Sequence, residues 1–584
     1  MNGKINTELT STSKDAHFDH IGADVGSSYK YSCIRDNYPL TSSLEDTNYR
    51  RVLEDRFASI FPMMKLFYIK NRIYLYDAKS NLLTEVNKNE LNILLRPQNK
   101  QKRGSHINKL VQKGIFSPGC LKQVVPDDDD INSIIHEQFS TYVPRKFVLE
   151  ITEDCTLSCK YCFYSKDTNI RKHSKRIMNE KIAFKAVDYY FDIYTSRIRK
   201  IPTLERKKIV KFAVPGISWW GGEPFLNFNL IKKTKEYIES LPWKEFDIIN
   251  TQLVYSVATN FTILNDEIID FLLKNNVYLY VSLDGDKNQN DTNRIFPNGS
   301  SSFDIVIENV NFMLEHYPEF CETRMIVQSV LLDNTDIDSQ LRFMEEYFAL
   351  NSQRRKILKH LSFPLKKEMV FLSELSTYKD IDLRIFKIKL DELTSLKTDD
   401  LIKLLNTDFN LLKEFENLLS LENALTFDEP QGEDYCVKNF SCPIGVDIIH
   451  ISCNGDIHIC NKTDYSFPLG NVKSGLDTNL LSELYSNYYS GFRNRCNTCW
   501  AFMFCTVCPA SILYKGTFYY PKDAECERMR KSLYNRMGKY ILFSQFYEFY
   551  DSIVSFLSTK EKSFLNFEGP IKINHFNKNI IINN

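Results

Sequence analysis

Three cysteines in one short segment have the residue type and the spacing for metal chemistry. Cys155, Cys159 and Cys162 are separated by three and two residues, and they closely follow the apolar run FVLEIT at 147–152. Three thiolates on one tight loop can bind three irons of a [4Fe–4S] cluster and leave the fourth iron open, which is typical of a catalytic metal site. The alternative is a zinc knuckle that lacks its fourth ligand. The position of the loop after a predicted strand favours the cluster.

The elements that must position this loop are short apolar segments that alternate with amphipathic stretches. The predicted strands lie at 147–152, 214–222, 252–259, 277–285 and 324–332, and the helices between them include 180–198, 229–241 and 265–275. Repeated strand–helix units give a parallel sheet whose strand C-terminal ends carry the chemistry. The sequence therefore predicts an α/β fold with a partial (β/α)6, TIM-like barrel.

Further motifs follow the second, third and fourth predicted strands. The second strand ends in the sequence WWGGEP, in which glycines allow close backbone approach and Glu223 can accept hydrogen bonds from an ammonium group. A simple Gly-Gly turn is the alternative. Ala258-Thr259-Asn260 and Ser282-Leu283-Asp284-Gly285 follow the next two strands. Every distinctive motif of this region thus falls at a strand end.

The cysteine loop resembles the signature of radical S-adenosylmethionine (SAM) enzymes, and the resemblance extends over residues 146–332. In that family the open iron binds the amino and carboxylate groups of S-adenosyl-L-methionine, and one electron cleaves the molecule to a 5′-deoxyadenosyl radical. The resemblance implies that Tyr161 lies near adenine. It also implies that the GGEP motif holds the methionyl amine, and here that motif is Gly221, Gly222, Glu223 and Pro224.

The same resemblance implies further cofactor contacts. Relatives have Thr-Asn-Gly after the third strand, and this sequence has Thr259-Asn260-Phe261. Asn260 is therefore the candidate cofactor contact. The loss of the glycine leaves the course of the loop open. Ser282 and Asp284 match residues that line the cofactor and substrate side. Arg294 matches a basic residue downstream of them, with a solvated surface arginine as the alternative.

Composition and cysteine usage exclude several classes of protein. The 584 residues are too many for a single hydrophobic core, so we expect several domains. The 74 basic side chains balance 74 acidic ones, so we expect no net charge that would attract nucleic acid or a membrane surface. No charge-free stretch is long enough for a membrane span, and the polar start resembles no secretion signal. An odd count of 15 cysteines argues for thiolate chemistry in a reducing compartment, which we expect to be the cytoplasm.

Nine of these cysteines lie between Cys436 and Cys526. On its own, the pattern Cys496-x2-Cys499-x5-Cys505-x2-Cys508 would be a zinc ribbon, but the eight thiols expected to bind metal suit two four-cysteine clusters. The arrangement resembles the SPASM domain, which binds two auxiliary [4Fe–4S] clusters. That resemblance implies one ligand set of Cys436, Cys442, Cys460 and Cys508, and a second of Cys496, Cys499, Cys505 and Cys526.

Two departures from that family pattern affect these ligand sets. The last cysteine pair is separated by two residues where the family has three, which makes Cys508 the least secure ligand. Cys453 is an extra thiol that we expect not to bind metal. With the barrel cluster, the sequence therefore predicts three [4Fe–4S] clusters.

The remaining segments predict the domain order. We expect a disordered tail at 1–45, a winged-helix-like module at 46–125, an acidic linker at 126–145, the barrel at 146–332, a helical insertion at 333–430, the auxiliary-cluster domain at 431–530 and a helical tail at 531–584. The second segment resembles elements that bind a leader peptide as an added strand. Lys100, Lys102 and Arg103 could help to hold an acidic leader, and a purely structural cap is the alternative.

These resemblances predict a radical SAM maturase that forms a crosslink, thioether or epimer in a ribosomally made precursor peptide. A low-potential donor such as flavodoxin or ferredoxin would supply electrons. One alternative is an anaerobic sulfatase-maturating enzyme, in which an aspartate follows the cysteine that matches Cys460. Here Asn461 cannot take a proton. A non-catalytic iron–sulfur or zinc scaffold is the other alternative.

Overall fold

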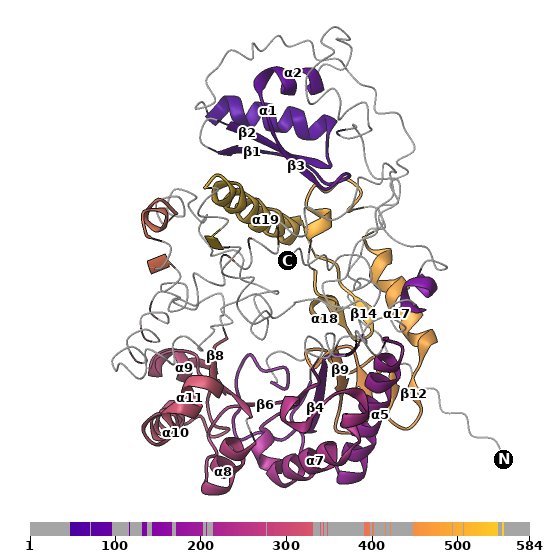
Figure 1. The fold of residues 1–584 in the computed structure, drawn as a ribbon, viewed down its shortest axis with the longest axis vertical. Helices are drawn as coiled ribbons and strands as arrows, with labels where there is room; N and C mark the ends of the chain where they lie inside the picture. The colour runs from indigo at the N-terminus through magenta and orange to yellow at the C-terminus, as the bar shows by residue number, and fades with distance from the viewer. Residues whose placement is uncertain are drawn as a thin grey trace, which may run out of the picture.

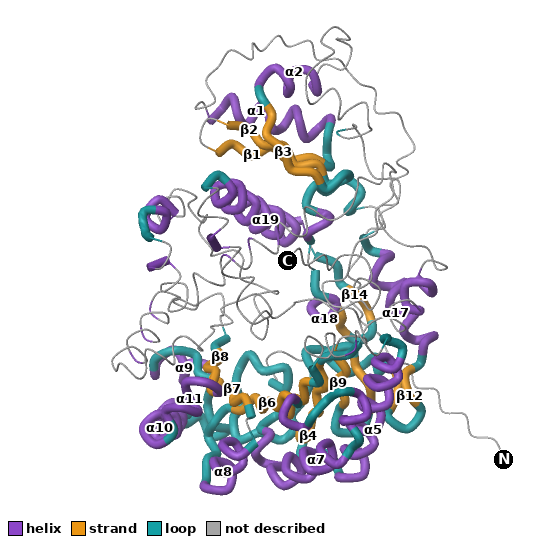
Figure 2. Tube along the Cα trace, in the orientation of Figure 1, coloured by secondary structure: helices purple, strands orange, loops and turns teal. Residues whose placement is uncertain are grey.

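A computed structural model describes residues 47–95, 131–136, 143–165, 171–202, 214–330 and 448–546, apart from a few positions inside them, and short pieces elsewhere. Figures 1 and 2 show a large sheet with helices in the lower part of the view and a smaller sheet above it. The predicted tail at 1–45, the acidic run at 126–130, Lys100, Lys102, Arg103, Cys436 and Cys442 lie outside the described residues, as does most of the segment 333–430.

The large sheet contains five parallel strands that were predicted from the sequence. They are β4 (Lys146–Thr152), β5 (Gly216–Gly221), β6 (Val254–Thr259), β7 (Tyr278–Ser282) and β8 (Met325–Gln328), and each pairs with the next. The helices α5 (Glu180–Arg199), α7 (Phe228–Ser240), α8 (Asp266–Lys274), α9 (Lys287–Asn293), α10 (Phe303–His316) and α11 (Pro318–Arg324) lie between them in the chain. This mixed α/β architecture, with its large parallel sheet, is consistent with a radical SAM partial barrel. The strands β5 to β8 are each shorter than predicted.

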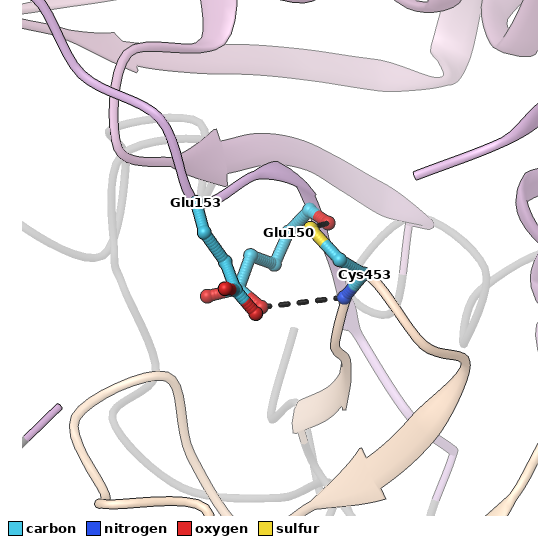
Figure 3. A group of neighbouring side chains, drawn as sticks. All are labelled: Glu150, Glu153 and Cys453. Atoms are coloured by element: carbon cyan, nitrogen blue, oxygen red, sulfur yellow. Dashed lines mark hydrogen bonds between the residues drawn. The ribbon is translucent and has the colours of Figure 1, made fainter. Parts of the chain in front are cut away.

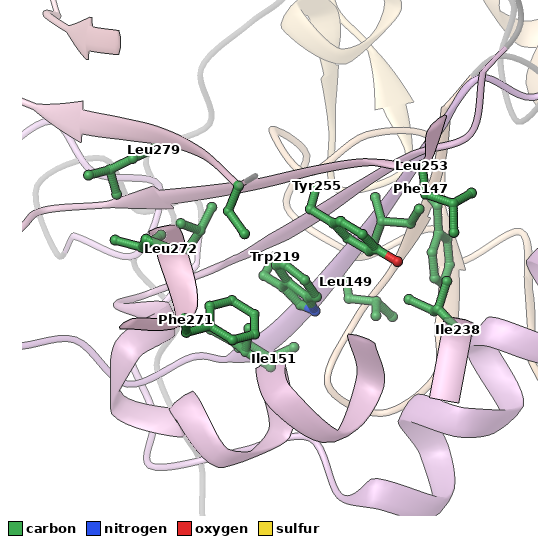
Figure 4. Packing of buried hydrophobic residues seen from close by; sticks show 14 of the residues in the cluster. Phe147, Leu149, Ile151, Trp219, Ile238, Leu253, Tyr255, Phe271, Leu272 and Leu279 are labelled. Carbon is green, nitrogen blue, oxygen red and sulfur yellow. The ribbon is translucent and has the colours of Figure 1, made fainter. Parts of the chain in front are cut away.

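Alternate residues of these strands pack against the helices. Phe147 stacks on Tyr190 of α5 with ring centroids 4.7 Å apart, and the Trp219 ring stacks on Tyr255 at 5.5 Å (Figure 4). The indole N–H of Trp219 donates to the Thr234 hydroxyl of α7 at 2.9 Å, so its one polar atom is paired in the core. The other residues of each strand face the opposite side of the sheet, where Glu150 and Trp220 lie.

The cysteine-rich region continues the same sheet, which the sequence did not predict. β9 (Ile448–Ile451) pairs in parallel with β4, and β10 (Asp456–His458), β11 (Gly470–Asn471) and β12 (Gly475–Leu476) follow in antiparallel order. Strands of two to four residues are too short to show an alternating pattern. Their pairing brings the segment around Cys453 and Cys460 beside the strand that leads to the first cysteine loop.

The N-terminal module has a three-stranded antiparallel sheet. Its elements are α1 (Thr47–Ile60), β1 (Met64–Ile69), β2 (Arg72–Asp77), β3 (Leu82–Val86) and α2 (Lys88–Leu95). The structure describes residues 47–95 of the segment predicted as a winged-helix-like module at 46–125, and nearly all of 96–125 lies outside the described residues. Phe67 of β1 stacks on Tyr534 with ring centroids 4.7 Å apart and meets Trp500 edge-on at 6.2 Å. The module therefore packs on the cysteine-rich region.

The remaining described elements are short apart from two helices. They are α17 (Thr478–Ser490), α18 (Pro509–Ile512), β13 (Leu513–Tyr514), β14 (Thr517–Phe518) and α19 (Asp523–Ser544), together with the 3-10 turns at 224–227, 243–246, 250–252 and 502–504. The last helix begins eight residues before the predicted start of the C-terminal tail at residue 531. Among the described residues, no helix combines the length and apolar character that crossing a membrane requires.

Candidate functional site

The three-cysteine loop leaves the C-terminal end of β4 and is held by backbone bonds. The N–H of Ser158 donates to the Ile295 carbonyl at 2.7 Å, and the N–H of Lys160 donates to the Asn293 carbonyl at 3.1 Å. Cys155, Cys159 and Cys162 form no disulfide with one another, and all three residues are partly exposed. The segment after α9 thus supports the loop along its length.

Gly221 and Gly222 bring the end of β5 against the start of this loop. The N–H of Gly222 donates to the Thr152 carbonyl, and the N–H of Glu223 donates to the Asp154 carbonyl, both at 2.8 Å. A Cβ atom would lie 2.2 Å from the Thr152 oxygen at position 221, and 2.1 Å from the Asp154 oxygen at position 222. The close approach that these glycines permit is therefore to the protein's own backbone.

Glu223 joins the ends of β5 and β6 from a fully buried position. Its carboxylate accepts hydrogen bonds from the Thr259 hydroxyl and the Asn260 N–H, both at 2.8 Å, and from the Phe225 N–H at 3.1 Å. Burial raises the pKa of this carboxyl to about 7, because it disfavours the charged form more than the three donors favour it. The next residue, Pro224, begins a short 3-10 turn.

Asn260 contacts the first cysteine of the loop. Its Nδ2 lies 2.9 Å from the Thr156 hydroxyl and 3.4 Å from Sγ of Cys155, and its Oδ1 accepts from the N–H of Thr262 at 3.0 Å. The next residue, Phe261, has a φ of +59°, which is the left-handed region that favours glycine. The loop thus keeps a glycine-like backbone although a buried phenylalanine occupies the position.

Asp284, Arg294 and Tyr161 form a compact buried group. The Arg294 guanidinium contacts both carboxylate oxygens of Asp284, at 3.0 and 3.1 Å, and the Tyr161 hydroxyl donates to the same carboxylate at 2.5 Å. Arg294 is 7% exposed, so the alternative of a solvated surface arginine is wrong. Ser282 is the last residue of β7 and precedes Asp284 by two positions; it is partly buried. These residues bring the end of β7 to the aromatic ring of the cysteine loop.

The thiols of the loop suit a positively charged, multi-iron group. Burial raises the pKa of Cys155 and of Cys162, and it raises that of Cys159 to about 12, which Arg294 opposes. A metal would be needed to hold them as thiolates. One zinc ion holds its sulfur ligands roughly 3.8 Å apart. Among the described side chains, the three loop sulfurs do not all lie within 4.8 Å of one another.

Only one group of described side chains places three ligand atoms within 4.8 Å of one another, namely Glu150, Glu153 and Cys453 (Figure 3). Both carboxylates already have cationic partners: Glu150 pairs with Arg171 at 3.2 Å and Glu153 with Arg176 at 3.0 Å. The Cys453 thiol donates to the Glu150 carbonyl at 3.0 Å. This group therefore forms part of the protein's own hydrogen-bond network rather than a metal site.

Burial and neighbouring cysteines raise the pKa of two described C-terminal thiols, Cys460 and Cys526. Burial raises the pKa of Cys460, and the nearby Cys508 raises it further. Burial likewise raises the pKa of Cys526, with further contributions from Cys505 and Cys499. Tyr488 lies near Cys496, Cys505 and Cys508, which come from both predicted ligand sets, so these contacts do not separate the two sets. The sets remain a prediction, because Cys436 and Cys442 lie outside the described residues.

Sequence reasoning missed several residues that position the site. Thr156 and Thr262 orient the Asn260 amide, with their hydroxyl oxygens 2.8 Å apart. Arg171 and Tyr465 converge on Glu150 from segments far apart in the chain. Neither motif nor periodicity marks these residues, since their contacts depend on tertiary structure.

Comparison with known proteins finds a family match over the segment that carries the site. Residues 149–335 match the family model described as the Radical SAM superfamily. A serine-type anaerobic sulfatase-maturating enzyme of Bacteroides thetaiotaomicron is 22% identical over 72% of this chain and 91% of its own length. The radical SAM cyclopropyl synthase TigE of Paramaledivibacter caminithermalis is 25% identical over 42% of this chain and 50% of its own. An uncharacterized protein of Methanocaldococcus jannaschii is 28% identical over 27% of this chain, which spans 44% of that relative.

The similarity to solved structures is weaker, both in sequence identity and in TM-score. The anSMEcpe protein with bound AdoMet superposes with a TM-score of 0.45 and 16% identity, over 71% of this chain and 98% of that one. SuiB of Streptococcus suis, bound to its precursor peptide SuiA, gives a TM-score of 0.36 and 15% identity, over 80% and 99% of the two chains.

Proposed function

We propose, starting from the radical SAM domain at residues 149–335, that this protein is a radical SAM enzyme that modifies a ribosomally made precursor peptide by forming a crosslink, thioether or epimer. The observation that carries the proposal is the three-cysteine loop at the end of β4, contacted by groups from the ends of β5, β6 and β7. S-adenosylmethionine and a [4Fe–4S] cluster, when bound, supply a radical that abstracts a hydrogen atom from the substrate.

The chain's own residues have distinct tasks in this proposal. Cys155, Cys159 and Cys162 would hold the cluster. Asn260 donates an N–H toward Cys155 and so stabilises negative charge on that sulfur. The Asp284–Arg294 pair fixes the Tyr161 ring, since it binds both the hydroxyl and the ring face, with the guanidinium 5.3 Å from the ring centroid. Glu223 holds the β5 turn and the Asn260 backbone in one arrangement.

The C-terminal thiols would hold two auxiliary [4Fe–4S] clusters that move electrons between the substrate and an external donor such as flavodoxin or ferredoxin. The proximity of Cys508 to Cys460, and of Cys505 and Cys499 to Cys526, supports this assignment. The N-terminal sheet would hold a leader peptide at one of its edge strands, since α19 packs on the face that carries Phe67.

The alternative substrate is a sulfatase. Similarity over 91% of a sulfatase-maturating enzyme favours it. The residue after Cys460 weighs against it, because Asn461 cannot act as a base where the resemblance calls for an aspartate. The precursor-peptide proposal needs no base at this position and accounts for the extra N-terminal module.

The test begins with anaerobically purified, full-length protein. Iron and acid-labile sulfide are expected, and zinc without iron would show a scaffold instead. With dithionite and S-adenosylmethionine, the wild type should produce 5′-deoxyadenosine and Cys159→Ala should not. A Cys499→Ala variant should retain some cleavage but yield no modified peptide. The matched control is Cys321→Ala, because Cys321 is a buried thiol of α11 and should leave the iron content unchanged.

The substrate is then identified by co-expression with the short reading frames beside the gene, and separately with a sulfatase. Mass spectrometry would show a crosslink as a loss of two hydrogens from the peptide. An epimer changes no mass, so it requires chiral analysis of the hydrolysed peptide. Formylglycine in the sulfatase and an unchanged peptide would establish the alternative.

A further inference from the structure

Arg171 connects two loops that carry cysteines. Its backbone N–H donates to the Phe163 carbonyl at 2.7 Å, which ties it to the residue after Cys162. In its guanidinium, Nη1 lies 3.2 Å from a Glu150 carboxylate oxygen and 3.4 Å from the Tyr164 hydroxyl, and Nη2 donates to the Asn461 carbonyl at 2.6 Å. One side chain thus reaches both the first cysteine loop and the residue after Cys460.

The guanidinium is enclosed by aromatic rings and one carboxylate. Its central carbon lies 4.0 Å from the Tyr465 ring centroid, 4.3 Å from that of Tyr164 and 5.5 Å from that of Trp220. Arg171 is 8% exposed and Glu150 is fully buried. A planar fork that stacks on aromatic faces and binds two acceptors suits arginine and not lysine.

Glu150, the partner of Arg171, accepts hydrogen bonds from three further segments of the chain. Its carboxylate accepts from the Tyr465 hydroxyl at 3.0 Å, from the Tyr164 hydroxyl, and from the Cys453 N–H at 3.3 Å. Tyr465 has a φ of +61°, a strained backbone that persists only where the surroundings hold it. Figure 3 shows the Cys453 main chain, from the β9–β10 turn, reaching the Glu150 carboxylate.

Burying an ion pair is rarely the most stabilising choice, because the loss of hydration offsets the attraction, and a role in specifying structure is the best-supported reason to keep one. Here the pair joins β4, the segment after Cys162 and the segment after Cys460. We propose that Arg171, held by Glu150, is a positioning residue that fixes the Cys460 loop relative to the Cys155–Cys162 loop. This inference rests on the proposed function, in which both loops bind clusters. The contact would then fix the relative position of the two clusters.

Arg171→Lys in the full-length, cluster-loaded protein is the first test. Lysine keeps the positive charge for Glu150 but has no fork that reaches the Asn461 carbonyl as well. Arg176→Lys is the matched control, since Arg176 lies in the same segment and pairs with Glu153, but its own side chain is 49% exposed. Hydrogen exchange in the peptides around 459–466 should be faster in Arg171→Lys and unchanged in the control.

Electron paramagnetic resonance supplies a readout that loosened packing alone would not move. In dithionite-reduced Arg171→Lys, the signal of the auxiliary cluster and its reduction potential should change. The signal of the barrel cluster with added S-adenosylmethionine should match wild type. Wild-type exchange and wild-type auxiliary signals in Arg171→Lys would overturn the inference while the proposed function stands. A wild type without iron would overturn the proposed function itself.

A second variant covers the case in which Arg171→Lys does not fold. Glu150→Gln with Arg171→Met removes both charges together and leaves no uncompensated ion in the core. If this double variant folds, faster exchange at 459–466 with an altered auxiliary signal supports the inference. Unaltered exchange and signals would overturn it.

Discussion

The Nδ2 atom of Asn260 lies 3.4 Å from Sγ of Cys155, so the residue that follows β6 touches the first cysteine of the loop that follows β4. The amide is oriented by Thr262, whose N–H and hydroxyl both donate to Oδ1, at 3.0 and 2.7 Å. The contact therefore depends on two strand ends and one turn, and it places an N–H donor at a prospective cluster ligand.

Replacing Asn260 by alanine should make the barrel cluster harder to reduce. An N–H directed at a sulfur stabilises the extra negative charge of the reduced cluster, and hydrogen bonds to sulfur are one determinant of cluster potential. We also expect a loss of about 1–3 kcal/mol in the free energy of unfolding, because the Thr262 donors lose their acceptor. Redox titration and urea unfolding measure the two effects. Asn298→Ala, in an exposed turn, is the control, and equal potentials in the two variants would contradict the assignment.

Gly221→Ala should reduce the iron content. The added Cβ would lie 2.2 Å from the Thr152 carbonyl oxygen, and the residue has a φ of +152°, so either the β5 turn or the start of the cysteine loop must move. Gly299→Ala is the matched control: its φ is +82°, but no atom lies within 4 Å of the new Cβ. The control should cost only the backbone strain of about 1–2 kcal/mol and retain its iron. Equal iron in both variants would show that the close contact does not position the loop.

The barrel strands could be predicted because each is a short apolar run, and motifs follow the first four of them at the ends where a parallel sheet carries its chemistry. The motifs at residues 155–162, 221–224 and 258–260 do meet at one edge of the sheet, as strand ends must. The pairing of β9 with β4 could not be predicted, since four residues carry no periodicity and the partner strand lies about 300 positions away in sequence.

The burial of single polar residues and their long-range contacts could not be predicted either, because no local sequence signal marks them. Arg294 has no local signal that separates a surface arginine from one paired with Asp284. Arg171 lies in a polar stretch, and only the fold brings it to Glu150 and Asn461. At Phe261 the substitution of the expected glycine left the backbone open, and the structure shows that the left-handed conformation is retained.

Phe261 allows a test in which the usual order of alanine and glycine is reversed. Both Phe261→Ala and Phe261→Gly remove a fully buried ring and should lower the free energy of unfolding by about 3–5 kcal/mol. Alanine retains the cost of a positive φ, whereas glycine does not, so Phe261→Gly should be the more stable variant by about 1 kcal/mol. Urea unfolding midpoints measure the difference. A more stable alanine variant would show that the loop changes conformation once the ring is removed.

Glu223 should make the stability of the metal-free protein fall as the pH rises from about 4.5 to about 7. Burial raises the pKa of this carboxyl in the folded state from 4.5 to about 7, so within that window the folded protein binds a proton that the unfolded chain has released. The free energy of unfolding then decreases with pH by a total of about 3 kcal/mol, and this group adds no further change above the window. Glu223→Gln cannot ionise and should lack this part of the slope, so the variant should gain stability relative to wild type between pH 5 and 7.5. Urea midpoints at both pH values give the slopes, with the exposed Glu245→Gln as control. Parallel slopes for wild type and Glu223→Gln would mean that the carboxyl is already charged at pH 5 in the folded protein.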